Sequence, residues 1–119
     1  MLESTEIKSR INQINKRLGF FYKTRQKSIQ FIFRNIKLMS GKRVRGLLVL
    51  LACEAACGKA KESALNTAAA VEFLHHATLI HDDIVDNSRK RRGEETLNKK
   101  LGYEFSVLTG DYLLSKVNA

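Results

Sequence analysis

Residues 62–86 read ESALNTAAAVEFLHHATLIHDDIVD, and this stretch predicts one long helix that decides the fold. At about 100° per residue, the side chains of His75, Asp82 and Asp86 fall within about 40° of one another on that helix. Small or apolar residues continue the same stripe toward the start of the helix: Ala64, Ala68 and Val71. The stripe is typical either of tight helix packing or of the wall of a tunnel. Without the acidic residues, His75 would be taken for a core or surface histidine.

Three carboxylates close this helix, at Asp82, Asp83 and Asp86. Acidic side chains at a helix C-terminus face the negative end of the macrodipole, so each costs on the order of a few tenths of a kcal/mol when it has no partner. Asp82 and Asp86 are four residues apart and therefore project from one face, about one turn from each other. A bound cation would make this arrangement favourable. Oxygen ligands with basic residues close behind them suit Mg²⁺ carrying phosphate better than zinc, so the sequence predicts a magnesium site.

The composition indicates an ordinary globular protein with an anionic partner. The chain has 119 residues and no proline, and its length fits one small domain or a piece of a larger one. Its formal charge of +9 points to nucleic acid, a lipid surface or phosphorylated small molecules. Nucleic acid is disfavoured, because neither a recognition motif nor base-stacking aromatic residues accompany the charge. No apolar run reaches the length of a transmembrane span and the first six residues lack the segments of a signal peptide, so we expect a cytoplasmic protein.

The rest of the chain reads as helices joined by short turns, which predicts an all-α bundle of about five to six helices. Ser4 suits the N-cap of a first helix whose apolar residues recur every three or four positions: Ile7, Ile11, Ile14 and Leu18. Further helices are expected over about 20–38, over 44–57 with Gly58 as the stop, over 97–102, and over 104–117 with an interruption at Gly110-Asp111.

Cys53 and Cys57 are four residues apart on the expected helix over 44–57. At that spacing, two cysteines in a cytoplasmic chain are more often buried, reduced thiols than a disulfide or half of a metal site. We therefore expect both thiols to be buried and free.

One basic segment precedes the acidic helix and another follows it. Gly41-Lys42-Arg43-Val44-Arg45 opens the helix over 44–57, where free backbone N–H groups, the positive end of the dipole and charged side chains together favour an anion. Lys42 and Arg45, three residues apart, can reach one diphosphate together. Arg89-Lys90-Arg91-Arg92 follows the acidic residues directly. Taken alone, the first segment also reads as a solvated charge run and the second as a structural ion-pair cluster, so these alternatives stay open.

Five motifs, in their order and spacing, resemble the N-terminal part of a trans-prenyl diphosphate synthase of the polyprenyl synthetase family. They are Gly41-Lys42-Arg43-Val44-Arg45, Glu72-Phe73-Leu74-His75, Asp82-Asp83-Ile84-Val85-Asp86, Arg91-Arg92-Gly93 and Gly110-Asp111-Tyr112-Leu113-Leu114. The resemblance runs from about residue 40 to residue 116 and implies a partial isoprenoid synthase fold. Residues 1–119 would then be one domain that corresponds to the N-terminal portion of a polyprenyl synthetase domain. Ala77 and Thr78 are similar to the small residues of long-chain, quinone side-chain synthases, and would form a pocket for the growing chain.

The resemblance also implies a role for each motif in joining isopentenyl diphosphate to an allylic diphosphate. Asp82, Asp83 and Asp86 would bind Mg²⁺ ions that hold the diphosphate of the allylic substrate, and Arg91 would add positive charge to it. Isopentenyl diphosphate would be bound by a second set of residues: Gly41, Lys42, Arg45, His75 and Arg92. Prenyl transfer in isoprenoid biosynthesis is therefore the expected function.

Three departures from the family pattern bear on that expectation. Gly46 follows Arg45, and Glu95 precedes Thr96, where the family usually has proline in both places. The family's second aspartate-rich motif is missing from this sequence. We therefore expect either a fragment or half-subunit of a prenyltransferase, or a non-catalytic diphosphate-binding or regulatory partner of a full-length synthase. Apolar stripes that a larger bundle would cover should be exposed, which predicts a homo-oligomer or a complementing synthase subunit.

Overall fold

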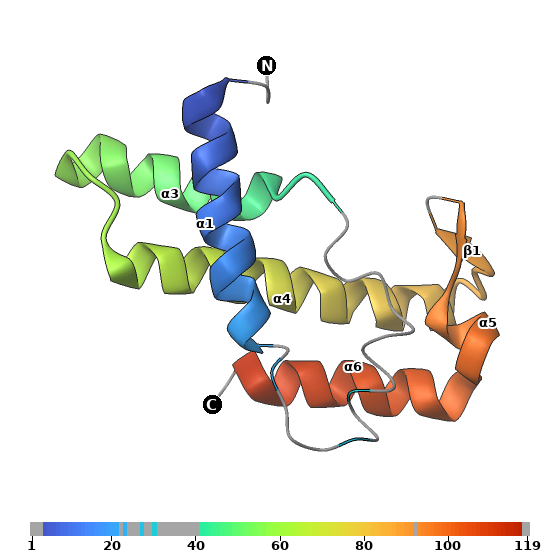
Figure 1. Cartoon of the computed structure of the whole chain (residues 1–119). Helices are drawn as coiled ribbons and strands as arrows, with labels where there is room; N and C mark the ends of the chain where they lie inside the picture. The colour runs from blue at the N-terminus through green and yellow to red at the C-terminus, as the bar shows by residue number, and fades with distance from the viewer. Residues whose placement is uncertain are drawn as a thin grey trace. The chain divides into compact units, whose positions relative to one another are not determined.

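The computed structural model describes residues 4–21, 23, 27, 30, 41–91 and 93–117, and helices dominate these residues. The helices are α1 (Thr5–Phe21), α3 (Val44–Cys57), α4 (Glu62–Val85), α5 (Leu97–Leu101) and α6 (Tyr103–Val117), as Figure 1 shows. Two short antiparallel strands, β1 (Lys90–Arg91) and β2 (Glu94–Glu95), lie between α4 and α5 in the chain. The predicted all-α class is confirmed. Most of the helix expected over about 20–38 lies outside the described residues.

The described residues belong to two compact units. The first unit takes residues 1–23 and 39–73, and the second takes residues 24–38 and 74–119. Helix α4 contributes its first part, residues 62–73, to the first unit and its second part, residues 74–85, to the second.

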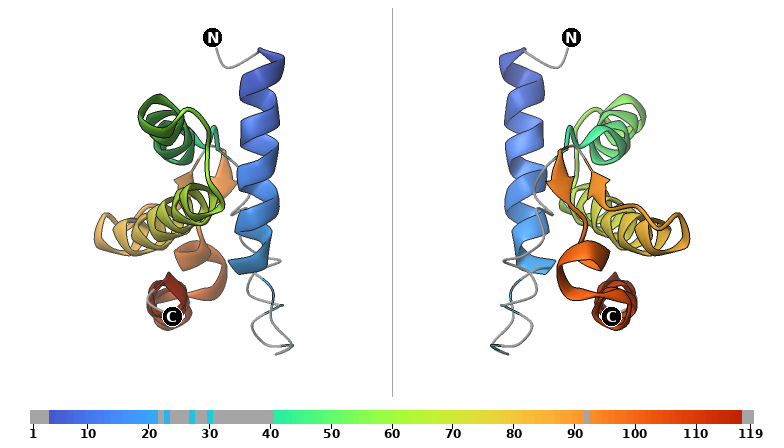
Figure 2. Two further views of the ribbon diagram at one scale, coloured as in Figure 1. Left: turned by 90° about the vertical axis from the view of Figure 1, so that its left-hand side faces the viewer. Right: turned by 90° about the vertical axis from the view of Figure 1, so that its right-hand side faces the viewer.

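The core of the first unit forms where α1 crosses α3 and the first part of α4, an arrangement that both views of Figure 2 show. Ile14 of α1 and Leu50 of α3 are fully buried or nearly so, and they cluster with Ala64 and Ala68 of α4. Burying a side chain the size of Ile14 or Leu50 contributes roughly 1.5–3 kcal/mol. Because both alanines are part of this packed cluster, the stripe of α4 serves helix packing at Ala64 and Ala68.

Local signals set the start of α1 and the end of α3 as predicted. The Ser4 hydroxyl accepts a hydrogen bond from the Ile7 amide at 3.2 Å, which makes Ser4 the cap of α1. Helix α3 stops at Gly58, which has a φ of 82° and donates its amide to the Glu54 carbonyl. Cys53 and Cys57 are both free thiols, but Cys57 is exposed and Cys53 only half-buried, so the expectation of buried thiols was wrong. Both cysteines lie in the last two turns of α3, beside the exposed turn at Gly58.

Among the described residues, two ion pairs tie α1 to the rest of the first unit. The Arg10 guanidinium binds both carboxylate oxygens of Glu54, at 2.9 and 2.7 Å. Arg17 donates to Glu62 at 2.6 Å and also to the side chain of Asn66. Some of the basic charge of the N-terminal region therefore serves packing between helices.

In the second unit, α6 runs beside the second part of α4, as Figures 1 and 2 show. Helix α6 continues without a break through Gly110, so the predicted interruption at Gly110-Asp111 was wrong. The reason is that Gly110 faces the His81 imidazole, and a Cβ at this position would overlap the ring. This glycine allows a close approach between two helices and does not end one.

Candidate functional site

The acidic motif lies at a sharply closed helix end. Asn87 takes a left-handed conformation with a φ of 52°, and its amide donates to the Ile84 carbonyl at 3.1 Å. The Ser88 amide donates to the Asp83 carbonyl at 2.8 Å, which completes a Schellman motif. The Asp86 amide donates to the Asp82 carbonyl at 2.8 Å, so these two residues are one turn apart, as their spacing predicts. Helix α4 ends at Val85, one residue before the predicted end.

The three carboxylates differ in exposure. Asp82 and Asp86 are exposed, whereas Asp83 is buried with 6% of its surface accessible. Across the described part of the chain, no group of three or more His, Cys, Asp or Glu side chains is already arranged to hold a metal ion. Magnesium, however, commonly uses one or two carboxylates, several waters and the phosphates of a substrate. The exposed pair Asp82 and Asp86 fits that mode of binding, in which the ion and the diphosphate arrive together.

His81, next to Asp82, joins α4 to α6. Its Nε2 lies 3.3 Å from the Val107 carbonyl oxygen and 3.5 Å from Oδ1 of Asp111. The sequence did not predict this contact. The pair Gly110-Asp111 was the sequence feature that could have indicated it. We interpreted this pair as a helix break, whereas in the structure it lies against the His81 ring.

The basic loop after α4 folds as a small hairpin. Its register places Lys90 opposite Glu95 and Arg91 opposite Glu94. Glu95, expected from the family pattern to be a proline, therefore lies across from Lys90, and such opposite charges contribute roughly 0.2–1 kcal/mol. Within the described side chains, neither Arg89 nor Lys90 forms an ion pair with Asp82 or Asp86, so these two bases do not support the ion-pair interpretation.

Two of the predicted diphosphate ligands in this loop are outside what the structure describes. The backbone of Arg91 is part of β1, but its side chain is not described. Arg92 is not described at all. Their roles stay predictions. The loop itself is held by Thr96, whose amide donates to the Arg89 carbonyl at 2.9 Å and whose hydroxyl donates to the Ser88 carbonyl at 2.7 Å.

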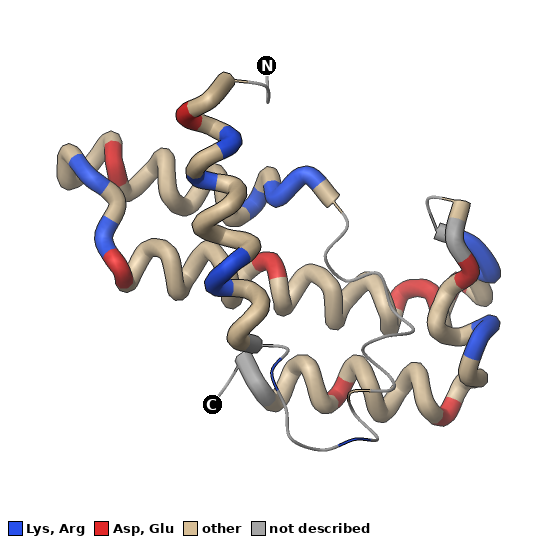
Figure 3. Tube along the Cα trace, in the orientation of Figure 1, with Lys and Arg blue, Asp and Glu red and all other residues tan. Residues whose placement is uncertain are grey.

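The basic turn, residues 41–45, runs into the first turn of α3 and presents two of its three bases. Gly41, Lys42 and Arg45 are exposed. Arg43 is left-handed with a φ of 58° and 2% exposed, and its Nε donates to Oδ1 of Asn15 at 2.7 Å. Figure 3 shows this turn as a blue run leading into α3. The turn can therefore offer an anion the side chains of Lys42 and Arg45, while Arg43 holds the turn against α1.

One backbone N–H at the start of α3 is already used by the protein. The Gly46 amide donates to Oε1 of Glu72 at 2.9 Å, and both residues are buried. The expectation that the first N–H groups of this helix are free for a ligand is therefore wrong for Gly46. The Glu72 carboxylate of α4 accepts the hydrogen bond that this N–H would otherwise donate to a bound anion.

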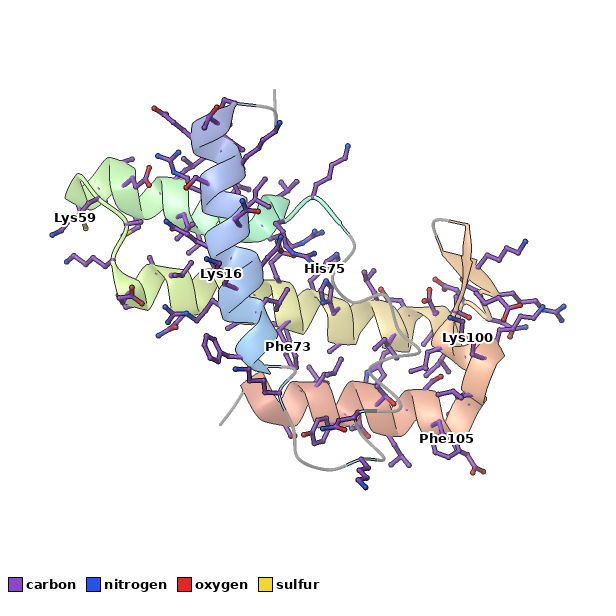
Figure 4. All side chains as sticks on the ribbon, viewed as in Figure 1. Lys16, Lys59, Phe73, His75, Lys100 and Phe105 are labelled. Carbon is purple, nitrogen blue, oxygen red and sulfur yellow. The ribbon has the colours of Figure 1, made fainter. Side chains whose placement is uncertain are left out.

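The remaining candidates are on the second part of α4. His75 is half-buried and is labelled in Figure 4, and its neighbour His76 is buried. Ala77 has no accessible surface, whereas Thr78 is exposed and donates its hydroxyl to the His75 carbonyl at 2.7 Å. Of the two residues assigned to a chain-length pocket, Thr78 is therefore the one that is accessible in the described structure.

The predicted site residues divide between the two units. The first unit holds Gly41, Lys42 and Arg45, and the second holds His75 with the acidic motif and the basic hairpin. Each unit thus brings together one part of the predicted set.

None of the described helices combines the length and the apolarity that a membrane span requires.

Comparison with known proteins gives a consistent result. A profile of the Polyprenyl synthetase family matches residues 26–119. The geranylgeranyl diphosphate synthase of Saccharolobus solfataricus is 41% identical over 106 residues, which cover 89% of this chain and 32% of that protein. The octaprenyl diphosphate synthase of Escherichia coli is 43% identical over 76 residues, which cover 64% of this chain and 23% of that protein.

A solved structure agrees with these matches. The crystal structure of polyprenyl synthase from Caulobacter crescentus, complexed with calcium and isoprenyl diphosphate, has a TM-score of 0.79 and 32% identity to this chain. The superposition covers 93% of this chain and 34% of that one. The chain thus spans between 23% and 34% of the length of these three proteins. The family match includes the acidic motif and both basic segments.

Proposed function

Because the chain belongs to the polyprenyl synthetase family, we propose that it acts in Mg²⁺-dependent prenyl transfer as a fragment or half-subunit that carries the first aspartate-rich motif. The substrates would be isopentenyl diphosphate and an allylic prenyl diphosphate. Residues 1–119 would form the N-terminal portion of a polyprenyl synthetase domain. The observation that carries this proposal is the exposed pair Asp82 and Asp86, one turn apart at a closed helix end, with bases directly after it.

Each candidate residue has a proposed task. Asp82 and Asp86, with Asp83 by the family motif, would hold the metal, and Arg91 would add positive charge to the allylic diphosphate. When bound, Mg²⁺ supplies positive charge that stabilises a departing diphosphate. The exposed Lys42 and Arg45, with Gly41, His75 and Arg92, would bind the second diphosphate. Thr78 and its buried neighbour Ala77 would border the growing chain.

The reaction needs charge and orientation more than covalent chemistry. The allylic C–O bond breaks and its electron pair leaves with the diphosphate, which creates an allylic cation. The double bond of isopentenyl diphosphate attacks this cation, a C–C bond forms, and a proton then leaves to the released diphosphate. No step uses a side-chain nucleophile, so the residues of this chain would act by fixing the two diphosphates and stabilising charge.

A pair of isosteric variants tests the metal role. We expect Asp82→Asn to weaken Mg²⁺-dependent binding of inorganic pyrophosphate at least about tenfold, which corresponds to about 1.4 kcal/mol, because an amide replaces one anionic ligand. Glu104→Gln, an exposed acid in the first turn of α6, is the matched control and should bind as the unchanged chain does. Isothermal titration calorimetry with and without Mg²⁺ measures both. Equal Mg²⁺-dependent affinity in Asp82→Asn and the unchanged chain would remove the basis of the proposal.

A second candidate is a non-catalytic diphosphate-binding or regulatory partner of a full-length prenyl synthase. The observation behind it is that no three His, Cys, Asp or Glu side chains among the described residues are already arranged to hold a metal ion. Incorporation of labelled isopentenyl diphosphate separates the two. Product formed by the chain alone, or after adding a protein with the second aspartate-rich motif, supports the enzyme or the half-subunit. Diphosphate binding without product in either mixture supports the partner.

Exposed apolar residues support association with another chain. Leu48 of α3 is 62% exposed, and Phe105 and Leu108 of α6 are 53% and 65% exposed. Figure 4 labels Phe105, which lies in the first turn of α6. We propose that a second copy or a complementing synthase subunit covers these side chains. A single monomeric species in light scattering at micromolar concentration would contradict the homo-oligomer.

A further inference from the structure

Glu72 is a buried carboxylate for which the proposed reaction has no task. It lies in the first part of α4 with 3% of its surface accessible. Burying a carboxylate is costly unless hydrogen bonds to it replace those of water. The Gly46 amide supplies such a bond, at 2.9 Å from Oε1. Gly46 is the third residue of α3, so this N–H is one of those that the helix itself leaves without a partner, and it lies at the positive end of the helix dipole.

Gly46 makes this bond possible in two ways. It has an N–H to donate, which a proline at this position would not have. It also has no Cβ, and one built here would lie 3.1 Å from the Ala68 carbonyl oxygen and 3.2 Å from Cγ of Glu72. Helices α3 and α4 therefore approach closely at this point, where even an added Cβ would be crowded, and the carboxylate bridges them.

The bond also fixes the basic turn, because the turn is attached on both sides. Arg43 is buried and left-handed, and it is bonded to Asn15 of α1. Gly46, three residues later, is bonded to Glu72 of α4. A left-handed conformation at a residue other than glycine costs on the order of 1 kcal/mol and persists where the surroundings hold it. Arg45 lies between these two inward attachments and Lys42 directly precedes the first, so both exposed side chains extend from a held backbone.

We propose that Glu72 is a positioning residue for diphosphate binding by Lys42 and Arg45. It acts through the Gly46 amide and does not touch the ligand itself. The proposal rests on the proposed function, because that function assigns the diphosphate of isopentenyl diphosphate to these two bases. The proposal adds that the affinity of Lys42 and Arg45 for diphosphate depends on a buried carboxylate, a group of opposite charge to these two bases.

The experiment measures pyrophosphate binding to the 119-residue chain by NMR in the absence of Mg²⁺, using the backbone amides of residues 41–45 as the local reporter. All variants are compared at a temperature where circular dichroism shows them to be fully folded. Glu72→Ala should weaken binding at these amides about tenfold, because displaced bases lose the geometry that a diphosphate requires. Glu72→Gln keeps an oxygen that can accept from Gly46, and should stay within about threefold of the unchanged chain. Loss of the negative charge alone would strengthen anion binding equally in both variants, so weaker binding in Glu72→Ala with rescue in Glu72→Gln cannot be an effect of charge.

A control variant and two reference variants separate failure of the positioning role from failure of the proposed function. Glu54→Ala removes another carboxylate of the first unit, the partner of Arg10 near the opposite end of α3, and should leave pyrophosphate binding unchanged. Lys42→Ala and Arg45→Ala define the binding that belongs to this site. If neither weakens it, the proposed function fails at this site, whatever Glu72 does. If both weaken it while folded Glu72→Ala binds as the unchanged chain does, Glu72 is a structural residue and the positioning role is overturned.

Discussion

Replacement of Gly46 by alanine sets two opposing effects against each other. Inside a helix, alanine is favoured over glycine by roughly 0.5–1 kcal/mol. The added Cβ, however, would lie 3.1 Å from the Ala68 carbonyl oxygen, 3.2 Å from Cγ of Glu72 and 3.2 Å from Cδ1 of Ile14. The oxygen belongs to the backbone of α4 and cannot move without the helix, and overfilling a packed core costs about 1–3 kcal/mol. We therefore expect Gly46→Ala to lower the free energy of unfolding by about 1 kcal/mol.

Gly19 of α1 provides the matched control, because a Cβ there meets nothing within 4 Å. Gly19→Ala should keep the helical preference without the crowding and raise the free energy of unfolding by about 0.5 kcal/mol. Urea denaturation followed by circular dichroism at 222 nm measures both variants, with the slope checked for a change in the exposed surface. If Gly46→Ala is stabilised as much as Gly19→Ala, the close approach of α3 to α4 is wrong, and so is the reasoning on Glu72 that depends on it.

Two further substitutions test contacts in each unit. Gly110→Ala should displace the His81 ring from Val107, because the added Cβ overfills this contact at a cost of about 1–2 kcal/mol, and the melting temperature should fall by several degrees. An unchanged melting temperature and an unchanged His81 ring signal in NMR would contradict this. The hydrogen bond from Arg10 lowers the pKa of Glu54, so the pair stabilises the fold above the ordinary pKa of a glutamate, about 4.3, and this contribution is lost as the pH falls through the lower, folded value. Glu54→Gln should therefore unfold with a weaker dependence on pH between about 5 and 3, and a pH profile parallel to that of the unchanged chain would exclude the pair as a source of acid sensitivity.

Helix boundaries could be predicted where neighbouring residues determine them. Helix α3 runs over Val44–Cys57 as predicted, because the glycine at 58 provides the left-handed residue that closes it. The cap at Ser4 and the start of α4 at Glu62 also follow from short-range signals. The stacking of Asp82 on Asp86 belongs to the same class, since it needs only the period of the helix.

Contacts between distant residues could not be predicted. A glycine in a helical pattern marks a helix stop, a break or a close approach between helices. Gly110 was predicted to be a break, because the residue that it contacts in space, His81, is 29 positions away in the sequence. Nothing local distinguishes Arg43, which turns inward, from Arg45, which stays exposed. The burial of Asp83 and the pairing of Gly46 with Glu72 likewise depend on which surfaces meet.

The closure of α4 has a consequence for how such a site can change. The loop after the acidic motif is attached through main-chain carbonyls, with the Ser88 amide bonded to Asp83 and the Thr96 hydroxyl bonded to Ser88. The carboxylates of Asp82 and Asp86 take no part in that attachment. Ionic strength, metal loading or substitution of either acid can therefore alter affinity while the backbone scaffold keeps its shape. Over evolution, the two acidic side chains can change without a change in the backbone hydrogen bonds that close the helix end.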